Sequence, residues 1–189
     1  MQIRQPVVAG QFYPADRQEC QEQIRECLAS HTLSETLPDP LVAGLVPHAG
    51  WAFSGPLAAM VFAAVKNQRS IVRTFVLFGA AHGYCGSAPA LDDSDAWETP
   101  LGRAPLNNSL CDSLIAAGVA VSVPSAHRRE HSIEVQVPFI QHLFPEAAIV
   151  PIIVPPHESA IALGEAVAHL ATDQAAGIVC IGSTDLTHY

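Results

Sequence analysis

The 189 residues are 49% hydrophobic and 14% charged, a composition that can bury a sizeable core in one domain and excludes wholesale disorder. Nine lysines and arginines against eighteen aspartates and glutamates give a net charge of −9, which disfavours nucleic-acid binding. The sequence shows no signal peptide and no apolar run of the roughly 20 residues that cross a membrane, so we expect a cytoplasmic protein without membrane contact. Five cysteines without a CxxC pair indicate neither a disulfide framework nor a zinc ribbon.

The first elements are a short extended segment and two helices that flank a strand. The extended segment ends in a turn at Pro14. Asp16, with Glu19 three residues later, resembles a capping box, and apolar residues at helical spacing predict a helix over 16–30. The apolar run 41–46 predicts a strand. A second helix is expected to begin near Ser54 as its N-cap, with Pro56 in its first turn.

The middle of the chain holds one clear strand, an irregular stretch and a helix interrupted by proline. The apolar run 74–78 has no alternation, which is typical of a strand covered on both faces. Residues 91–103 are expected to form a loop or an edge strand. A helix opens at His131, and Pro138 should kink it unless the helix begins later. The remaining expected elements are strands over 119–123, 148–154 and 177–181 and helices over 108–117 and 158–171.

Strands that alternate with helices predict an α/β fold. Its central sheet should be mostly parallel or mixed, with helices on both faces. We expect residues 1–189 to form one domain. The last strand leads into a histidine-bearing loop where a covering helix normally follows, so we also expect this domain to lack a C-terminal segment.

Three histidines stand at or shortly after the ends of apolar strands, and they are His48, His82 and His188. Parallel strands bring these ends to one edge of a sheet, where ligands usually bind. Neutral imidazoles with open coordination positions suit Fe²⁺, Zn²⁺ or another divalent metal such as Cu²⁺. Taken singly, each histidine is better explained as a hydrogen-bonded loop residue than as a metal ligand. Asp185 either orients an imidazole or caps a turn.

A competing pattern lies at residues 127–131, which read HRREH. In the H-x-x-E-H pattern two histidines one helical turn apart bind zinc, and the glutamate acts as base of a metallopeptidase. This reading needs a helix through His127 and His131, whereas the apolar stripe starts only at Ile133. Glu130 and Glu134 are either a wall of a site or a charged helix start.

Six motifs occur in order along the chain. They are VAGQFYPAD near the start, PHAGWAFSG, GAAHG, TPLG, EHSIEVQVPF and the final STDLTHY. In this order and spacing they resemble the Memo family, whose prokaryotic members are called AmmeMemoRadiSam system protein B, and the resemblance covers the chain from Val7 to Tyr189.

This resemblance implies a fold similar to that of the class III extradiol dioxygenases, which are non-heme iron enzymes. It implies that His48 and His82 bind the metal and that His188 is the acid/base beside it. In Memo proteins a cysteine beyond the last motif is the third ligand. None of the five cysteines here matches that position, so the implied site lacks one ligand.

Several functions therefore remain open. One is a dioxygenase-like oxidoreductase that uses Fe²⁺, with His188, Asp185 and His131 as candidate catalytic residues. Another is a binding or scaffolding protein that keeps the pocket for a small molecule or peptide without turnover. The family name also implies partners of the AMMECR and radical-SAM types. The zinc metallopeptidase is a further alternative.

Overall fold

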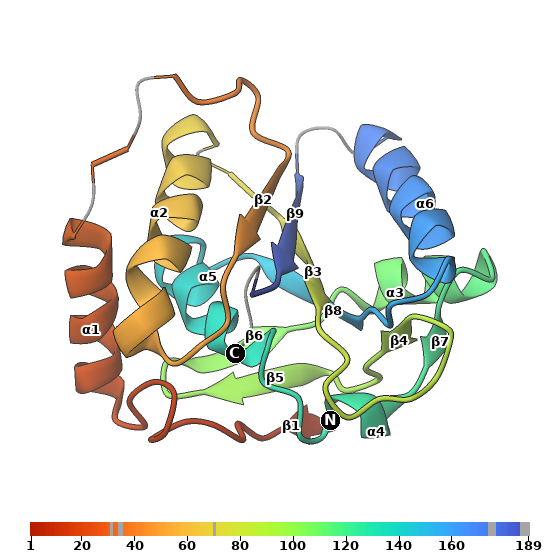
Figure 1. Ribbon diagram of the computed structural model, residues 1–189, viewed down its shortest axis with the longest axis horizontal. Coiled ribbons are helices and arrows are strands. Elements are labelled where there is room, and N and C mark those ends of the chain that lie inside the picture. Colours follow the sequence, from red (N-terminus) through yellow and green to blue (C-terminus); the bar gives the residue numbers. More distant parts are fainter. Residues whose placement is uncertain (31, 34–35, 70, 174–176, 186–189) are drawn as a thin grey trace.

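A computed structural model describes residues 1–30, 32–33, 36–69, 71–173 and 177–185 of the chain (Figure 1). The helices are α1 (Arg17–Ala29), α2 (Trp51–Gln68), α3 (Asn108–Ala116), α4 (Pro124–His127), α5 (Val137–Leu143) and α6 (Ser159–Asp173), with a 3-10 helix, η1, over Glu134–Gln136. The strands are β1 (Ile3–Arg4), β2 (Ala43–Val46), β3 (Thr74–Gly79), β4 (Ala90–Leu91), β5 (Ala96–Thr99), β6 (Gly102–Pro105), β7 (Val121–Ser122), β8 (Ala148–Ile153) and β9 (Ile178–Ser183).

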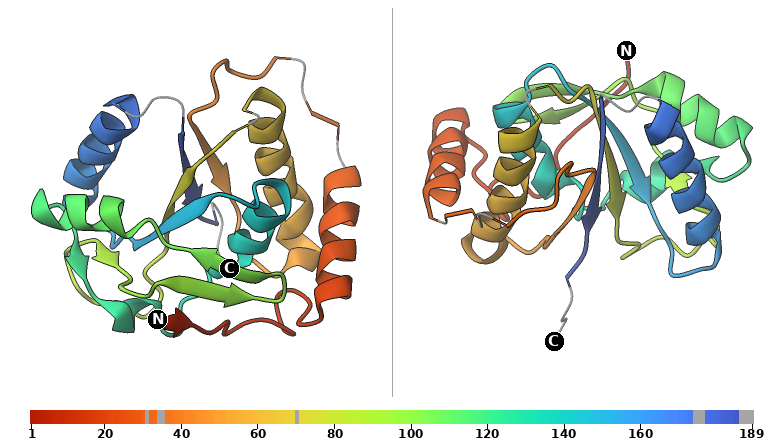
Figure 2. Two further views of the ribbon diagram at one scale, coloured as in Figure 1. Left: turned by 180° about the vertical axis from the view of Figure 1, so that it is seen from behind. Right: turned by 90° about the horizontal axis from the view of Figure 1, so that it is seen from above.

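The main sheet has the strand order β2-β9-β3-β8-β4-β7. Strands β2, β9, β3 and β8 run parallel, whereas β4 runs antiparallel to β8. Helices α1, α2 and α5 lie on one face of this sheet, and α3 and α6 lie on the other (Figure 2). The α/β class with a mixed central sheet and helices on both faces is thus confirmed. Among the described helices, none is long and apolar enough to cross a membrane.

Strand β3 shows why the central strands read as continuous apolar runs. Phe75 and Leu77 point into the core beneath α2 and α5. Val76, between them, belongs to the second core beneath α3 and α6. Because both faces of the sheet are covered, successive side chains are all buried and the sequence loses its alternation.

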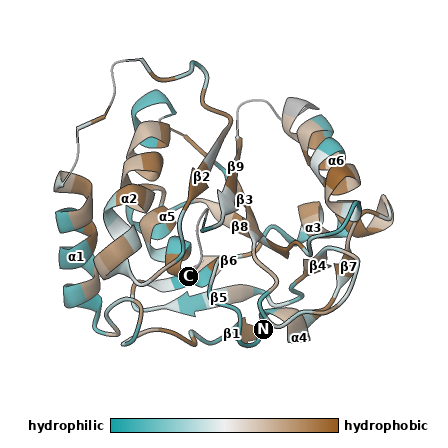
Figure 3. Cartoon of the chain, viewed as in Figure 1, coloured by the Kyte–Doolittle hydropathy of each residue, from teal (hydrophilic) through white to brown (hydrophobic). Residues whose placement is uncertain are grey.

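Helix α1 packs outside α2 and forms an outer layer. Asp16 caps α1, as the sequence predicted, because its Oδ1 accepts hydrogen bonds from the backbone N–H groups of Gln18 and Glu19. The inward face of α1 buries Cys20, Ile24 and Cys27. In Figure 3 α2 is coloured mostly hydrophobic and α1 largely hydrophilic, as expected when α2 is covered on two sides and α1 on one.

The expected start of the second helix is wrong. Helix α2 begins at Trp51 with Gly50 as its N-cap, and Pro56 lies inside the helix rather than in its first turn. Trp51 is 1% exposed and packs against Phe139 with ring centroids 4.5 Å apart. The backbone N–H of Trp51 also donates to the carbonyl of Phe12. Burial of this tryptophan, which a capping pattern does not reveal, explains the earlier start.

Two other expectations are refined by the structure. The stretch 91–103 is only partly a loop, because β5 and β6 form a hairpin that pairs with β1 in a separate three-stranded sheet. The helix expected from His131 starts later, because α5 begins at Val137. This is the outcome in which Pro138 does not kink the helix. Pro138 lies in the first turn of α5, where its missing N–H removes no hydrogen bond.

Gly79, at the end of β3, lies in close contact with the segment that follows α4. A Cβ atom there would stand 2.5 Å from Cγ1 of Ile133 and 2.7 Å from Oγ of Ser132. We expect Gly79→Ala to lower the free energy of unfolding by about 1–3 kcal/mol through overpacking, as measured by urea denaturation.

The matched control is Gly164→Ala in α6, where an added Cβ atom meets nothing within 4 Å. That variant should be neutral, or more stable by up to about 1 kcal/mol, because alanine is the better helix former. Equal effects of the two substitutions would contradict the close packing described at Gly79.

Candidate metal centre

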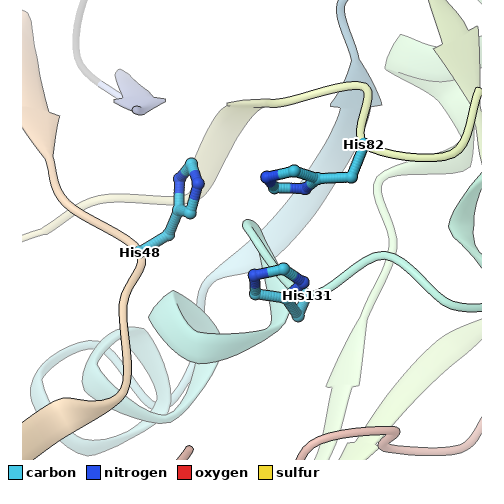
Figure 4. A group of neighbouring side chains, drawn as sticks. All are labelled: His48, His82 and His131. Carbon is cyan, nitrogen blue, oxygen red and sulfur yellow. The ribbon is translucent and has the colours of Figure 1, made fainter. Parts of the chain in front are cut away.

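Three histidines converge at the carboxyl edge of the main sheet, as Figure 4 shows. His48 follows β2 after one proline, and His82 is the third residue after β3. His131 comes from the turn between α4 and η1. The ring centroid of His48 lies 5.2 Å from that of His82 and 5.7 Å from that of His131. Both pairs of rings are edge-to-face. The rings of His82 and His131 stack at 4.7 Å.

The three imidazoles form a group that fits a metal ion. One ring nitrogen from each lies within 4.8 Å of the others. Three nitrogens at about 2.0–2.1 Å from a tetrahedral zinc ion stand about 3.4 Å apart, so ring movements of roughly 1 Å suffice to converge on one ion. The side chain of His82 is 37% exposed, which leaves this side of the group open to a ligand.

Glu130 contacts the ring of His82 through a hydrogen bond. Its Oε1 lies 2.9 Å from Nδ1 of His82. A carboxylate accepts only, so Nδ1 carries the proton and donates it, and the lone pair is on Nε2. Metal-binding histidines characteristically donate their second ring nitrogen in this way.

His48 is anchored by the end of β9. Its backbone N–H donates to Oδ1 of Asp185 at 2.9 Å. Its Nδ1 lies 3.5 Å from Oγ of Ser183, which donates its own proton to the carbonyl of Ser132. Nε2 of His48 lies 3.6 Å from Oδ2 of Asp185, so this carboxylate adds negative charge directly beside the group.

Burial keeps two of the three imidazoles neutral. It lowers the pKa of His48, against the opposing charge of Asp185, and the neighbouring imidazoles lower it further. Burial also lowers the pKa of His131, although Glu130 opposes the shift. A neutral imidazole is the form that binds a metal, so both rings are ready to bind near neutral pH.

These lowered values predict a pH dependence of stability. His48, His127 and His131 all have pKa values below the ordinary 6.5 because they are buried. The unfolded chain therefore takes up protons first as the pH falls, and the metal-free protein should lose stability as the pH drops below about 6.5. Urea denaturation at pH 7.5, 6.5 and 5.5 with a chelator measures this loss. His127→Gln should flatten the dependence, and a wild-type stability that rises on acidification would contradict it.

The segment 130–136 joins the site to three other parts of the chain. Oγ of Ser132 accepts from the backbone N–H of Ala80, just after β3. The amide of Gln136 donates to the carbonyl of Pro47 and to Oγ of Ser183. Glu134 accepts from the N-terminal segment. The ends of β2, β3 and β9 are therefore tied together through one stretch.

The H-x-x-E-H interpretation is wrong. Helix α4 ends at His127, and His131 lies outside a helix, so the two rings are not one helical turn apart on a common face. His127 is fully buried, and its Nε2 lies 3.0 Å from the carbonyl of Ala90. Its ring packs edge-on against Trp97, away from the three-histidine group. His127 is a buried core residue at the end of α4, not the loop residue that the sequence indicated.

The other residues singled out from the sequence have separate positions. Asp185 lies beside His48, whereas His188 is outside the described residues. Glu130 contacts the group, but Glu134 does not form its wall, because it binds Arg4 instead.

The sequence interpretation missed the pairing of His131 with His48 and His82. The available signal was the polar run Glu130-His131-Ser132 directly before an apolar stripe, which the sequence indicated to be a site wall or a helix start, with His131 as a candidate catalytic residue rather than a metal ligand. From the sequence, Phe12 could line a pocket or belong to the core. Its ring contacts that of His131 edge-on at 4.8 Å and forms one side of the site.

Comparisons with known proteins identify relatives over almost the whole chain. A family model described as Memo-like protein matches residues 4–189. The chain is 39% identical to MEMO1 family protein MK0963 of Methanopyrus kandleri, with 98% of this chain and 69% of that protein aligned. It is 41% identical to a MEMO1 family protein of Thermotoga maritima, with 98% and 70% aligned. A MEMO1 family protein of Methanococcoides burtonii is 36% identical, with 99% and 69% aligned.

Proposed function

This chain belongs to the Memo family, and from that premise we propose that it is a metal-dependent protein with a three-histidine centre. His48, His82 and His131 would hold a divalent ion. The observation that carries the proposal is the approach of three ring nitrogens to within 4.8 Å of one another. The hydrogen bond from Nδ1 of His82 to Glu130 supports it, because metal-binding histidines characteristically donate their second ring nitrogen in this way.

The donor set narrows the choice of metal. Imidazole nitrogen suits Fe²⁺, Zn²⁺ and Cu²⁺ better than Mg²⁺ or Ca²⁺, which prefer oxygen ligands. Three histidines with an open position are one known ligand set for catalytic zinc, whereas two histidines and a carboxylate are typical of oxygen-activating Fe²⁺. Asp185, beside His48, supplies a carboxylate close to the group.

The reaction that we propose is a dioxygenase-like oxidation of a small diol. A bound ion would act as a Lewis acid on the substrate oxygens and, as Fe²⁺, would provide the redox chemistry. Asp185, whose Oδ2 lies 3.6 Å from Nε2 of His48, would accept a proton from a substrate hydroxyl. Phe12 provides an apolar surface beside His131 against which a ring could pack. The exposed face of His82 is the side from which a substrate would enter.

A binding protein is the second proposal. The group of potential ligands found among the described residues consists of three histidines, with neither a carboxylate nor a thiolate among them. Such a neutral set binds a metal without the anionic ligand that oxygen-activating Fe²⁺ sites use. In this case the centre would serve to bind a small molecule, a peptide or a partner of the AMMECR or radical-SAM type.

Metal titration and oxygen uptake separate these proposals. Anaerobic titration with Fe²⁺, and parallel titration with Zn²⁺, should show one ion bound per chain. Sustained oxygen uptake by the Fe²⁺ form with a panel of catechols would support the enzyme. Stoichiometric metal binding without turnover would support the binding protein, and no stoichiometric binding of either ion would overturn both.

A further inference from the structure

We infer that Glu130 is the positioning residue of the three-histidine centre, which it serves by fixing the ring of His82 and the backbone that carries His131. This inference rests on the proposed function and deepens it, because it names the residue that fixes the positions of two of the three histidine ligands relative to each other. Glu130 acts through these histidines, since it is not itself a member of the group whose ligand atoms converge.

One carboxylate collects the donors of two separate segments. From the loop after β3, Oε1 of Glu130 accepts from Nδ1 of His82 at 2.9 Å, and Oε2 accepts from the backbone N–H of the same residue at 3.2 Å. From its own segment, Oε1 accepts from the backbone N–H groups of His131 and Ser132, both at 2.8 Å. Four donors therefore converge on two oxygens that have no proton of their own.

The setting of Glu130 makes these hydrogen bonds strong. The residue is 4% exposed. Four donors around a buried carboxyl group fit its ionised form, in which both oxygens accept. Hydrogen bonds to an ionised, buried acceptor are shorter and roughly twice as strong as those between neutral groups. The carboxylate is thus a rigid anchor.

Two consequences follow for the metal centre. Donation from Nδ1 selects the tautomer of His82 in which the proton is on Nδ1 and the lone pair is on Nε2, whereas an unanchored imidazole exchanges between both tautomers. The shared carboxylate also sets the separation of the two segments. The rings of His82 and His131 accordingly stack at 4.7 Å with an interplanar angle of 15°.

The test is Glu130→Gln, compared with Glu98→Gln as the matched control. Glu98 pairs with Arg103 in the β5–β6 hairpin and belongs to no group near the histidines. Glutamine keeps the length of the side chain but replaces one acceptor oxygen with a donor. We expect Glu130→Gln to weaken Zn²⁺ binding about 10–100-fold in a chelator competition assay, and Glu98→Gln to leave it unchanged.

A second readout needs no metal. Long-range ¹H–¹⁵N spectra of the metal-free protein report which nitrogen of His82 carries the proton. The wild-type protein and Glu98→Gln should show protonated Nδ1, and Glu130→Gln should show a mixture of both tautomers.

The outcomes distinguish this inference from the proposed function. Protonated Nε2 of His82 in the wild-type protein would overturn the inference, whether or not the variant folds. Glu130→Gln with an unchanged His82 tautomer and an unchanged Zn²⁺ affinity would also overturn the inference. A wild-type protein that binds no Zn²⁺ or Fe²⁺ would instead overturn the proposed function, and the tautomer measurement would still decide the role of Glu130 as an anchor of His82.

Discussion

Replacing any one of His48, His82 and His131 with alanine is expected to lower the affinity for Zn²⁺ or Fe²⁺ by at least about a hundredfold, more than loss of an outer hydrogen-bond partner costs. Each ring provides one of the three nitrogens that lie within 4.8 Å of one another. The variant at His131 is the most informative, because the family resemblance implies only His48 and His82 as metal ligands and the structure adds His131 as the candidate third. Isothermal titration under anaerobic conditions measures the three affinities.

His157→Ala is the control for this series. His157 is exposed, and its hydrogen bonds are local ones to Ser159. Its removal should leave metal affinity unchanged. If His131→Ala binds metal as tightly as the wild-type protein while His48→Ala does not, the centre is a two-histidine site and the three-histidine assignment is wrong.

Glu134→Ala should lower the free energy of unfolding by about 3–5 kcal/mol, because it leaves a buried charge unpaired. Glu134 is 1% exposed and lies 2.9 Å from Nη1 of Arg4, whose side chain is 7% exposed. The same carboxylate accepts from the backbone N–H groups of Val7 and Val8 and from the hydroxyl of Tyr13. One substitution therefore removes the hydrogen bonds that Arg4, Val7, Val8 and Tyr13 donate to this carboxylate. Urea denaturation, with the midpoint and slope fitted together, measures the loss.

Exposed and double variants complete this test. Glu98→Ala removes a surface ion pair with Arg103 and should cost less than about 1 kcal/mol. Combining Glu134→Leu with Arg4→Leu should cost less than the sum of the two single substitutions, because no lone charge is then buried. If Glu134→Ala is no more costly than Glu98→Ala, the N-terminal segment is held by other contacts.

Much of the fold could be predicted because its central strands are buried on both faces. The runs 74–78, 148–154 and 177–181 lie on the parallel strands β3, β8 and β9, whereas the run 41–46 lies on β2, an edge strand whose Leu45 is exposed. Burial of both faces imposes a continuous apolar pattern that is visible in the sequence alone. The Asp16 cap was predictable for a similar reason, because its hydrogen bonds are made within the first turn.

Strand β4 could not be predicted from local pattern, whereas β7 lies within the strand expected over 119–123. Strand β4 has two residues, and it exists because β8 offers an edge to which it pairs. Partners distant in the sequence decide such pairing. The hairpin of β5 and β6 turns at Gly102, whose φ of +115° favours glycine, but the surrounding acidic and irregular residues obscured it.

The site was predictable to the extent that strand ends determine it. His48 and His82 follow β2 and β3, and parallel topology places them together. His131 follows no strand. Its position depends on a turn held by the side chains of Glu130 and Ser132, which bond to other segments. A turn fixed by tertiary hydrogen bonds leaves no periodic signal, so the third member of the group had to come from the structure.

X-ray absorption at the zinc or iron edge of the metal-loaded protein tests the three-histidine centre most directly. The account predicts a first shell of nitrogen and oxygen scatterers near 2.0–2.1 Å, with the multiple-scattering pattern of three imidazoles. That pattern should fall to two imidazoles in His131→Ala. A sulfur scatterer near 2.3 Å, or a spectrum that is unchanged by His131→Ala, would contradict the assignment of His131 as a ligand.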